Sequence, residues 1–338
     1  MKILHFLRKD ILGGTEKSVI NIASGLKARG LDVSVAILEG KADVSRILKE
    51  KDIKCYLFDT CYNISDITLF FKIRDLFKNN SFDIVTFYGL KLNLISRILR
   101  KTGCRIPVHL GGLRSIYPSD SASDLHILID KITFRFSNGY ISNSKKAVEF
   151  LTAKGFPKEK MFYIPNGIER ISIEIKGSRN DFYKKLGINV NDNDTVLISV
   201  ANLREVKNHL FMFEVFKGLL KEFDNVKLIL VGDGPLREVL KEKVKEITCE
   251  EKIFFLGKQL DVFEFLVHSD ILILTSKWEG LPTSIMEASA VGLPVVSTNV
   301  GGISELVIDK KTGFLLEQGD LNGFVERIKY LIQNKEIR

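Results

Sequence analysis

Two glutamates and a helix start near residue 280 form the part of this sequence best suited to bind a polar ligand. Glu279 follows an apolar strand, and Glu287 comes about one turn into a helix whose first position we assign to Pro282. Carboxylates accept hydrogen bonds from hydroxyl groups, and a helix start attracts anions through its unpaired N–H groups and positive dipole end. The combination predicts a site for sugar hydroxyls beside a phosphate, although an ordinary strand–loop–helix unit with two surface glutamates has the same pattern.

Three further turns follow predicted strands and carry residues that suit phosphate groups. Arg204 and Lys207 could converge on a diphosphate, arginine as a planar fork and lysine as a point charge. Gly13 and Gly14 lie between the first strand and the first helix, where a missing side chain lets a ligand approach the backbone. Gly232 opens a similar turn. Plain turns between strands and helices would look the same, and none of the three has the GxGxxG spacing of dinucleotide-binding proteins.

The stretch that holds both glutamates, EGLPTSIMEASAVGLPVVSTNVGGISELV, resembles the glutamate-pair signature of the retaining glycosyltransferases of family 4. The resemblance covers most of the chain and is strongest from Val200 to Phe314. It implies the GT-B fold, an α/β architecture of two Rossmann-like domains facing a cleft. It also implies transfer of a hexosyl or N-acetylhexosaminyl group from a nucleotide diphosphate sugar, with a UDP-sugar expected, to a glycan or lipid-diphosphate-linked acceptor in polysaccharide or glycoconjugate biosynthesis.

The resemblance implies roles for residues of the second half. Glu279 would bind the donor sugar, and Lys207 and Arg204 would hold the diphosphate as part of the catalytic site. Asn202 stands where many family members have the arginine, so Arg204 is expected to fill that role from two positions later. The residues that would bind the nucleotide and its phosphates are Gly13, Gly14, Asn202, Gly232, Gly257, Lys258, Gly280, Leu281, Thr283, Ser284 and Glu287, with Glu287 on the ribose hydroxyls.

In the first half, the resemblance implies a catalytic group in the stretch PVHLGGLRS. Either His109, which we place at the end of a strand, or Arg114 in the following loop would fill this role. In the second half, the glycine pair Gly301 and Gly302 would support the fold beside the cleft.

Two other functions stay open on the sequence alone. A nucleotide-sugar epimerase of the same architecture would need acid and base groups at the sugar instead of an acceptor site, and a non-catalytic nucleotide-sugar-binding protein would not consume the donor. No Asp-x-Asp motif or His/Cys cluster stands out, so we expect neither a metal requirement nor any cofactor besides the nucleotide sugar as co-substrate. The four cysteines show no metal or disulfide spacing and indicate a reducing cytoplasm.

The length of 338 residues and the apolar content of 45% predict two domains with full cores. Strand and helix patterns alternate up to Pro165 and again from Thr195, which indicates two parallel sheets. We therefore expect an acceptor-binding domain over 1–165 and a nucleotide-sugar-binding domain over 166–338, with the polar stretch 165–194 beginning as a linker. The helix Asn322–Ile332 would be the last element, so the crossover helix typical of the family would be absent or shortened.

Positive charge is concentrated in the first domain. Residues 1–165 hold 27 lysines and arginines against 16 acidic residues, whereas the remainder holds 23 against 26. Helices expected over 67–77 and 91–101 mix apolar and basic residues and predict binding to an anionic membrane surface from the cytoplasm, although helices packed on a sheet would share this pattern. No apolar run has membrane-spanning length, no signal peptide is expected, and the aromatic residues follow core spacing, so no nucleic-acid partner is expected.

Overall fold

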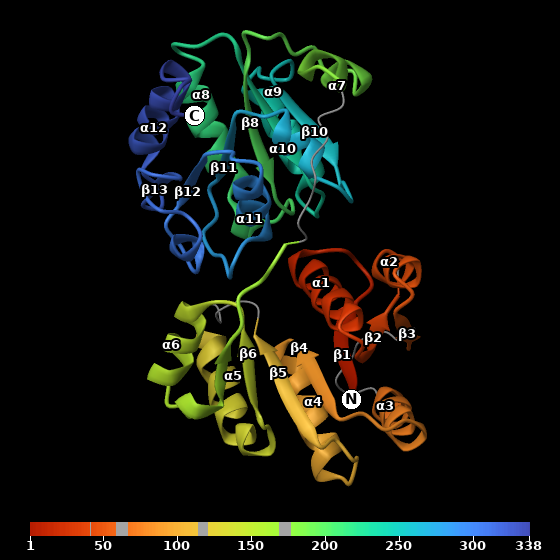
Figure 1. The fold of residues 1–338 in the computed structure, drawn as a ribbon. Coiled ribbons are helices and arrows are strands. Elements are labelled where there is room, and N and C mark those ends of the chain that lie inside the picture. Colours follow the sequence, from red (N-terminus) through yellow and green to blue (C-terminus); the bar gives the residue numbers. More distant parts are fainter. Residues whose placement is uncertain (41, 59–66, 114–120, 169–176) are drawn as a thin grey trace. The chain divides into compact units, whose positions relative to one another are not determined.

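A computed structural model of the protein describes residues 1–40, 42–58, 67–113, 121–168 and 177–338. The chain divides into two compact units, Met1–Glu169 and Arg170–Arg338, and the boundary expected after residue 165 lies four residues before this division (Figure 1). Each unit is built on one sheet of parallel strands with helices on both faces. The prediction of two Rossmann-like α/β folds is confirmed.

The N-terminal unit alternates strands and helices along the chain. Its elements among the described residues are β1 (Lys2–Lys9), α1 (Gly14–Ala28), β2 (Asp32–Glu39), α2 (Val44–Glu50), β3 (Lys54–Leu57), α3 (Ile67–Asn79), β4 (Ile84–Tyr88), α4 (Leu90–Lys101), β5 (Val108–Leu113), α5 (Ser121–Thr133), η1 (Phe134–Phe136), β6 (Gly139–Ser142), α6 (Lys145–Ala153), η2 (Lys158–Lys160) and β7 (Met161–Tyr163). The sheet order is β3-β2-β1-β4-β5-β6-β7. Successive residues of β1 point to opposite faces, so Leu4 and Phe6 join the core under α3 and α4, whereas Ile3 and Leu7 join the core under α1 and α2.

Helices α3 and α4 do not present the apolar faces that a membrane contact would require. In α4, Leu92, Ile95 and Leu99 are buried in the core on the sheet, and in α3 Phe77 is buried there as well. Phe71 of α3 remains exposed. Ile98 of α4 is exposed as well. The prediction of a membrane contact is therefore wrong for the buried residues of these helices, because a parallel sheet is covered on both faces and these residues are its cover.

The C-terminal unit repeats the same pattern. Its elements are α7 (Arg179–Lys185), β8 (Thr195–Val200), η3 (Glu205–Lys207), α8 (His209–Leu219), β9 (Val226–Val231), α9 (Arg237–Glu246), β10 (Ile253–Gly257), α10 (Phe263–Val267), β11 (Ile271–Leu274), α11 (Thr283–Ala290), β12 (Val295–Thr298), η4 (Ile303–Glu305), β13 (Gly313–Leu316) and α12 (Leu321–Gln333). The sheet order is β10-β9-β8-β11-β12-β13. Leu197 of β8 joins a core with α8, α9 and α12, and its neighbours Val196 and Ile198 join one with α7, α10 and α11.

Helix α7 lies within the polar stretch 165–194, at whose start we expected a linker and in which we predicted no helix. The Ser178 side chain caps it by accepting a hydrogen bond from the Asp181 backbone N–H, and Phe182 and Tyr183 are buried against the sheet. The helix is only seven residues long. Two buried aromatic residues are too few to produce a recognisable helical period, which explains why the sequence pattern missed it.

Candidate functional site

The carboxyl ends of β8 and β11 lie side by side at the point where the strand order of the C-terminal sheet reverses. The two strands are adjacent and parallel, and successive strands are added outward from them in opposite directions. Loops that follow such a pair diverge, and this edge is where open parallel sheets bind ligands. The loop after β8 carries Arg204 and Lys207, and the loop after β11 carries Glu279. The structure thus brings three predicted residues to one edge.

An ion pair joins the two loops. Lys207 Nζ donates to Glu279 Oε1 at 2.5 Å, and Ser276 Oγ donates to the same carboxylate oxygen at 2.6 Å. Glu279 is 6% exposed, and the Lys207 side chain is 20% exposed. Hydrogen bonds between charged groups are among the stronger ones, especially where water is partly excluded. A ligand at this edge would therefore meet a cation and an anion that are already in contact.

The backbone around Lys207 is held against the end of β11. Thr275 Oγ1 donates to the carbonyl oxygens of Lys207 and Asn208, at 3.2 and 3.0 Å. Asn208 has a φ of 52°, which turns the chain from η3 directly into α8, and asparagine tolerates this left-handed conformation. The sequence analysis missed Thr275 and Ser276 because hydroxyl residues are common at strand ends and carry no distinctive spacing.

Helix α11 supplies the second glutamate of the pair. The helix begins at Thr283, and Pro282 is its N-cap with φ −68° and ψ 121°, so the expected first position for Pro282 is wrong by one residue. The fixed φ of proline fits either position, whereas its extended ψ places it before the helix. Ser284 and Glu287 are buried on one side of the first turns, and Thr283 is half-buried. The start of α11 also presents first-turn N–H groups, which suit a phosphate.

The backbone that carries Glu279 is clamped by the glycine pair that follows β12. Gly301 has a φ of +56°, and a Cβ there would lie 1.9 Å from the carbonyl oxygen of Glu279. The N–H of Gly302 donates to the carbonyl oxygen of Gly280 at 2.8 Å. Position 301 therefore requires glycine both for its conformation and for this close approach. Leu281, the next residue of the loop, is buried.

The turn after β9 packs on the loop after β8. Gly232 has a φ of +146°, and a Cβ there would lie 1.9 Å from the carbonyl oxygen of Ala201. The N–H of Gly232 donates to the carbonyl oxygen of Gly257 at 2.8 Å, which joins a third predicted segment to the first two. Of the predicted residues in these segments, Asn202, Arg204 and Lys258 have exposed side chains.

Two candidates of the N-terminal unit lie at the start of α1. Gly13 is the N-cap with a φ of −137°, an extended conformation that any residue adopts, and Gly14 is the first helical residue. A Cβ at Gly13 would lie 2.8 Å from a carboxylate oxygen of Glu16, so the missing side chain leaves room for that carboxylate. The remaining loop candidate, Arg114, lies outside the described residues.

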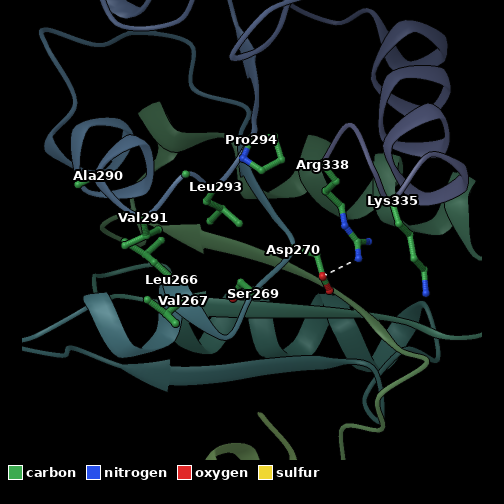
Figure 2. A pocket seen from close by; sticks show the side chains of 11 residues that line it. Leu266, Val267, Ser269, Asp270, Ala290, Val291, Leu293, Pro294, Lys335 and Arg338 are labelled. Carbon is green, nitrogen blue, oxygen red and sulfur yellow. Dashed lines mark ion pairs between the residues drawn. The ribbon is translucent and has the colours of Figure 1, made fainter. Parts of the chain in front are cut away.

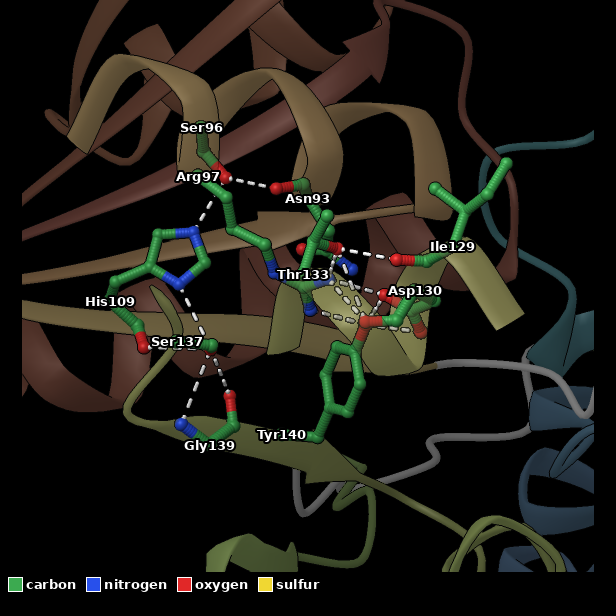
Figure 3. A network of polar contacts seen from close by, with 10 residues as sticks. All are labelled: Asn93, Ser96, Arg97, His109, Ile129, Asp130, Thr133, Ser137, Gly139 and Tyr140. Carbon is green, nitrogen blue, oxygen red and sulfur yellow. Dashed lines mark hydrogen bonds and ion pairs between the residues drawn. The ribbon is translucent and has the colours of Figure 1, made fainter. Parts of the chain in front are cut away.

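His109 lies near the start of β5 instead of at its end, and its imidazole is fully buried. Its Nε2 is 2.5 Å from Ser96 Oγ and its Nδ1 is 3.0 Å from Ser137 Oγ (Figure 3). Burial, together with the charges of Arg97 and Arg100, lowers the pKa of His109 to about 3. A neutral imidazole with both nitrogens paired inside the core does not reach a substrate, so the predicted catalytic role is wrong and His109 is a core residue.

A cavity of about 590 Å³ lies at the opposite edge of the C-terminal sheet. Asp270 and Pro294, which precede β11 and β12, line it together with Lys335 and Arg338 (Figure 2). The Asp270 carboxylate bonds Arg338 at 2.9 Å and Arg179 at 2.7 Å. Because the cavity lies at the amino ends of the strands, it is separate from the edge that carries Lys207 and Glu279.

Two further properties concern the described part of the chain as a whole. Within these residues, no three His, Cys, Asp or Glu side chains are grouped so that they could hold a metal ion. None of the helices described has both the length and the apolar character needed to cross a membrane.

Both units match families of known proteins. Residues 12–170 match the family described as Glycosyltransferase Family 4, and residues 181–338 match the family described as Glycosyl transferases group 1. N-acetyl-alpha-D-glucosaminyl L-malate synthase of Bacillus anthracis is 34% identical over 165 residues, which are 49% of this chain and 42% of that protein. The match therefore spans less than half the length of this relative.

Two other proteins match along nearly the whole chain. UDP-Gal:alpha-D-GlcNAc-diphosphoundecaprenol alpha-1,3-galactosyltransferase of Escherichia coli is 24% identical over 348 aligned positions, which cover 99% of this chain and 89% of that protein. The crystal structure of Anabaena HepE in complex with UDP-glucose has a TM-score of 0.87 at 23% identity, covering 100% of this chain and 91% of that one. The predicted GT-B fold is therefore confirmed.

Proposed function

Because this chain belongs to glycosyltransferase family 4, we propose that it transfers a sugar from a nucleotide diphosphate sugar with retention of the anomeric configuration. The proposed donor is a UDP-sugar that carries a hexosyl or N-acetylhexosaminyl group. The proposed acceptor is a glycan or a lipid-linked sugar of polysaccharide or glycoconjugate biosynthesis. The Escherichia coli relative is named for transfer from UDP-Gal to a diphosphoundecaprenol-linked sugar, which supports a UDP-sugar as donor and a lipid-linked sugar as acceptor.

The ion pair at the edge of the C-terminal sheet is the observation that carries this proposal. Loss of a nucleoside diphosphate from a sugar develops negative charge on the phosphates and positive charge on the sugar ring. Lys207, Arg204 and the first-turn N–H groups near Thr283 would stabilise the phosphates. Glu279 would accept hydrogen bonds from the donor sugar and Glu287 from the ribose. Both signs of charge are thus available within one small, partly buried region.

Donor binding would exchange the partner of Lys207. In the structure the Lys207 ammonium is bonded to Glu279, and Ser276 donates to the same carboxylate oxygen. A diphosphate would compete for the ammonium, because both groups are anionic acceptors. Glu279 would then accept hydrogen bonds from sugar hydroxyls, and Ser276 would continue to donate a hydrogen bond to its carboxylate. We therefore propose that phosphate binding prepares the sugar subsite.

The charge stabilisation supplied by lysine, arginine and a helix start would take the place of a metal ion. We propose that transfer requires no cofactor besides the nucleotide sugar and continues in the presence of EDTA. A lipid-linked acceptor would bring the protein to the cytoplasmic surface of a membrane. Loss of activity in EDTA, restored by a divalent cation, would contradict the proposal that transfer needs no metal ion.

The test begins with a thermal-shift screen of UDP-, GDP- and ADP-sugars, in which the true donor stabilises the native state by mass action. Donor consumption is then measured with and without lipid-diphosphate-linked and free glycan acceptors, and the anomeric configuration of the product is determined by NMR. The expected result is acceptor-dependent release of UDP and a product with the anomeric configuration of the donor. An inverted product, an epimerised donor without acceptor, or binding without turnover would overturn the proposal.

A further inference from the structure

Helix α5 exposes four large apolar side chains on one side, and on its other side it buries an aspartate together with Ile127. Leu125, Leu128 and Ile132 are 60%, 52% and 58% exposed, and Ile129 beside them is also exposed. The spacing of three, four and seven residues places them on one side of the helix. Asp130 on the other side is fully buried. These four apolar residues are called the α5 stripe below.

A buried ion pair fixes α5 in this orientation. Arg97 of α4 bonds the Asp130 carboxylate at 2.6 Å, and the Tyr140 hydroxyl donates to both oxygens of the same carboxylate at 2.5 and 2.7 Å (Figure 3). Arg97 also donates to Thr133 Oγ1 at 2.7 Å and to the Tyr140 hydroxyl at 2.8 Å. Turning the helix to bury the α5 stripe would break this pair and leave charges buried without partners, which is strongly unfavourable. The stripe is therefore held outward by the core of its own domain.

Among the side chains that the structure describes, the exposed charges beside the α5 stripe on α5 and α4 are basic. Lys131 and Arg135 are exposed within and just after α5, and Asp130, the acidic residue directly before Lys131, is buried. The neighbouring helix α4 adds exposed Ile98 and exposed Lys101, whose ammonium lies 5.6 Å from the ring centre of Phe136 in η1. In the described segment Leu125–Phe136, every exposed formal charge is therefore positive. Aliphatic side chains beside basic ones suit the boundary between acyl chains and anionic headgroups.

We propose that the α5 stripe binds the protein to an anionic membrane surface, with its leucines and isoleucines among the acyl chains and Lys131 and Arg135 at the headgroups. A second copy of the chain fits less well, because symmetric pairing of the stripes would bring the two basic clusters together. Nucleic acid fits less well, because the stripe offers aliphatic residues and no aromatic platform for bases. The proposal extends the membrane location that a lipid-linked acceptor would require, but no residue of the donor site takes part, so membrane binding and sugar transfer can be tested separately.

The test is co-sedimentation of the full chain with phosphatidylcholine vesicles that contain or lack phosphatidylglycerol. The wild-type chain should bind the anionic vesicles and bind less at high salt. The Leu128→Glu/Ile132→Glu double variant should lower the partition coefficient by about tenfold or more, because it removes two inserted apolar groups and adds repelled charges. The Lys131→Gln/Arg135→Gln variant should weaken binding to anionic vesicles only.

Val239→Glu/Ile308→Glu is the matched control, since both side chains are exposed and apolar but belong to the C-terminal unit, and it should bind vesicles like the wild type. Circular dichroism and donor-dependent thermal shift establish that each variant is folded. The proposal is overturned if the wild-type chain does not bind anionic vesicles, or if the Leu128→Glu/Ile132→Glu variant binds them equally well. A dimer in light scattering that this variant converts to a monomer would also overturn it, in favour of a second copy.

Discussion

Single residues at the carboxyl edge of β8 and β11 have roles that depend on one another. The sequence predicted Lys207 and Glu279 as separate ligand contacts, one for phosphate and one for sugar. It gave no sign that the two bond each other across 72 residues of chain. A pairing of this kind depends on which strands become neighbours, and local spacing does not encode that. The direct contact changes what each substitution is expected to do.

Replacing Lys207 by alanine should remove a charge-assisted contact to the donor phosphates, which is worth on the order of 1.5–3 kcal/mol. We expect a loss of roughly 10- to 150-fold in kcat/KM and in affinity for UDP. The measurements are steady-state kinetics and titration calorimetry with UDP. Lys277→Ala is the control, since Lys277 is exposed in the loop after β11 and pairs with exposed Glu205. Equal kcat/KM and equal UDP affinity in the Lys207→Ala and Lys277→Ala variants would refute the assignment of Lys207 to the donor phosphates.

Changing each glutamate to glutamine should separate their proposed partners. Glu287→Gln should weaken binding of both UDP and the UDP-sugar, because its proposed partner is the ribose. Glu279→Gln should weaken binding of the UDP-sugar alone, and it should keep or strengthen UDP binding because Lys207 loses its competing anion. Calorimetry with both ligands measures the difference. If the two variants change both affinities by the same factor, this division of roles is wrong.

At the scale of elements, the alternation of strands and helices was predictable because short continuous apolar runs, which become strands buried on both faces, alternate with longer stretches of helical period. The orientation of helices was less predictable. Hydropathy made α4 resemble a membrane-facing helix, whereas most of its apolar residues pack on the sheet and α5 carries the exposed apolar stripe. The orientation of α5 depends on the ion pair between Arg97 and Asp130. Hydropathy values of single residues treat each charged residue as exposed, so they do not predict that two charges are buried together as a pair.

His109 joins three elements and makes the N-terminal unit sensitive to acid. Its ring contacts Ser96 of α4 and Ser137 before β6, and its pKa is about 3 when folded against an ordinary value of 6.5. The unfolded chain therefore binds a proton at a higher pH than the folded one. The stability that depends on neutral His109 is complete above about pH 6.5, and it is lost progressively as the pH falls toward 3, by up to about 1.4 kcal/mol per pH unit.

Hydrogen exchange of β5 amides, followed from pH 7 to pH 4, measures this slope in the N-terminal unit. His109→Gln should flatten the slope whatever its effect on stability at neutral pH, because glutamine does not titrate there. The control is His126→Gln, since His126 is exposed on α5. The same slope in His109→Gln and in the wild-type chain would show that His109 is not the responsible group.

At the scale of the whole molecule, the donor-site segments described above belong to the C-terminal unit, apart from Gly13 and Gly14, and the one tryptophan of the chain, Trp278, adjoins Glu279. UDP at about 100 times its Kd should raise the free energy of unfolding of this unit by about 2.7 kcal/mol. The stability of the N-terminal unit should change much less. Urea unfolding followed by Trp278 fluorescence reports the stability of the C-terminal unit, and hydrogen exchange of β4 and β5 reports that of the N-terminal unit. Greater stabilisation of the N-terminal unit would contradict the assignment of the site.

The strand orders also determine when each sheet can form during synthesis on the ribosome. Strands β1–β7 and β8–β13 each come from one uninterrupted part of the chain, and β7, the last strand of the first sheet, is an edge strand. Strand β1 has both of its neighbours, β2 and β4, long before β8 emerges, whereas β8 must wait for β11. Nascent chains stalled within the C-terminal unit should therefore already protect β1–β7 from protease.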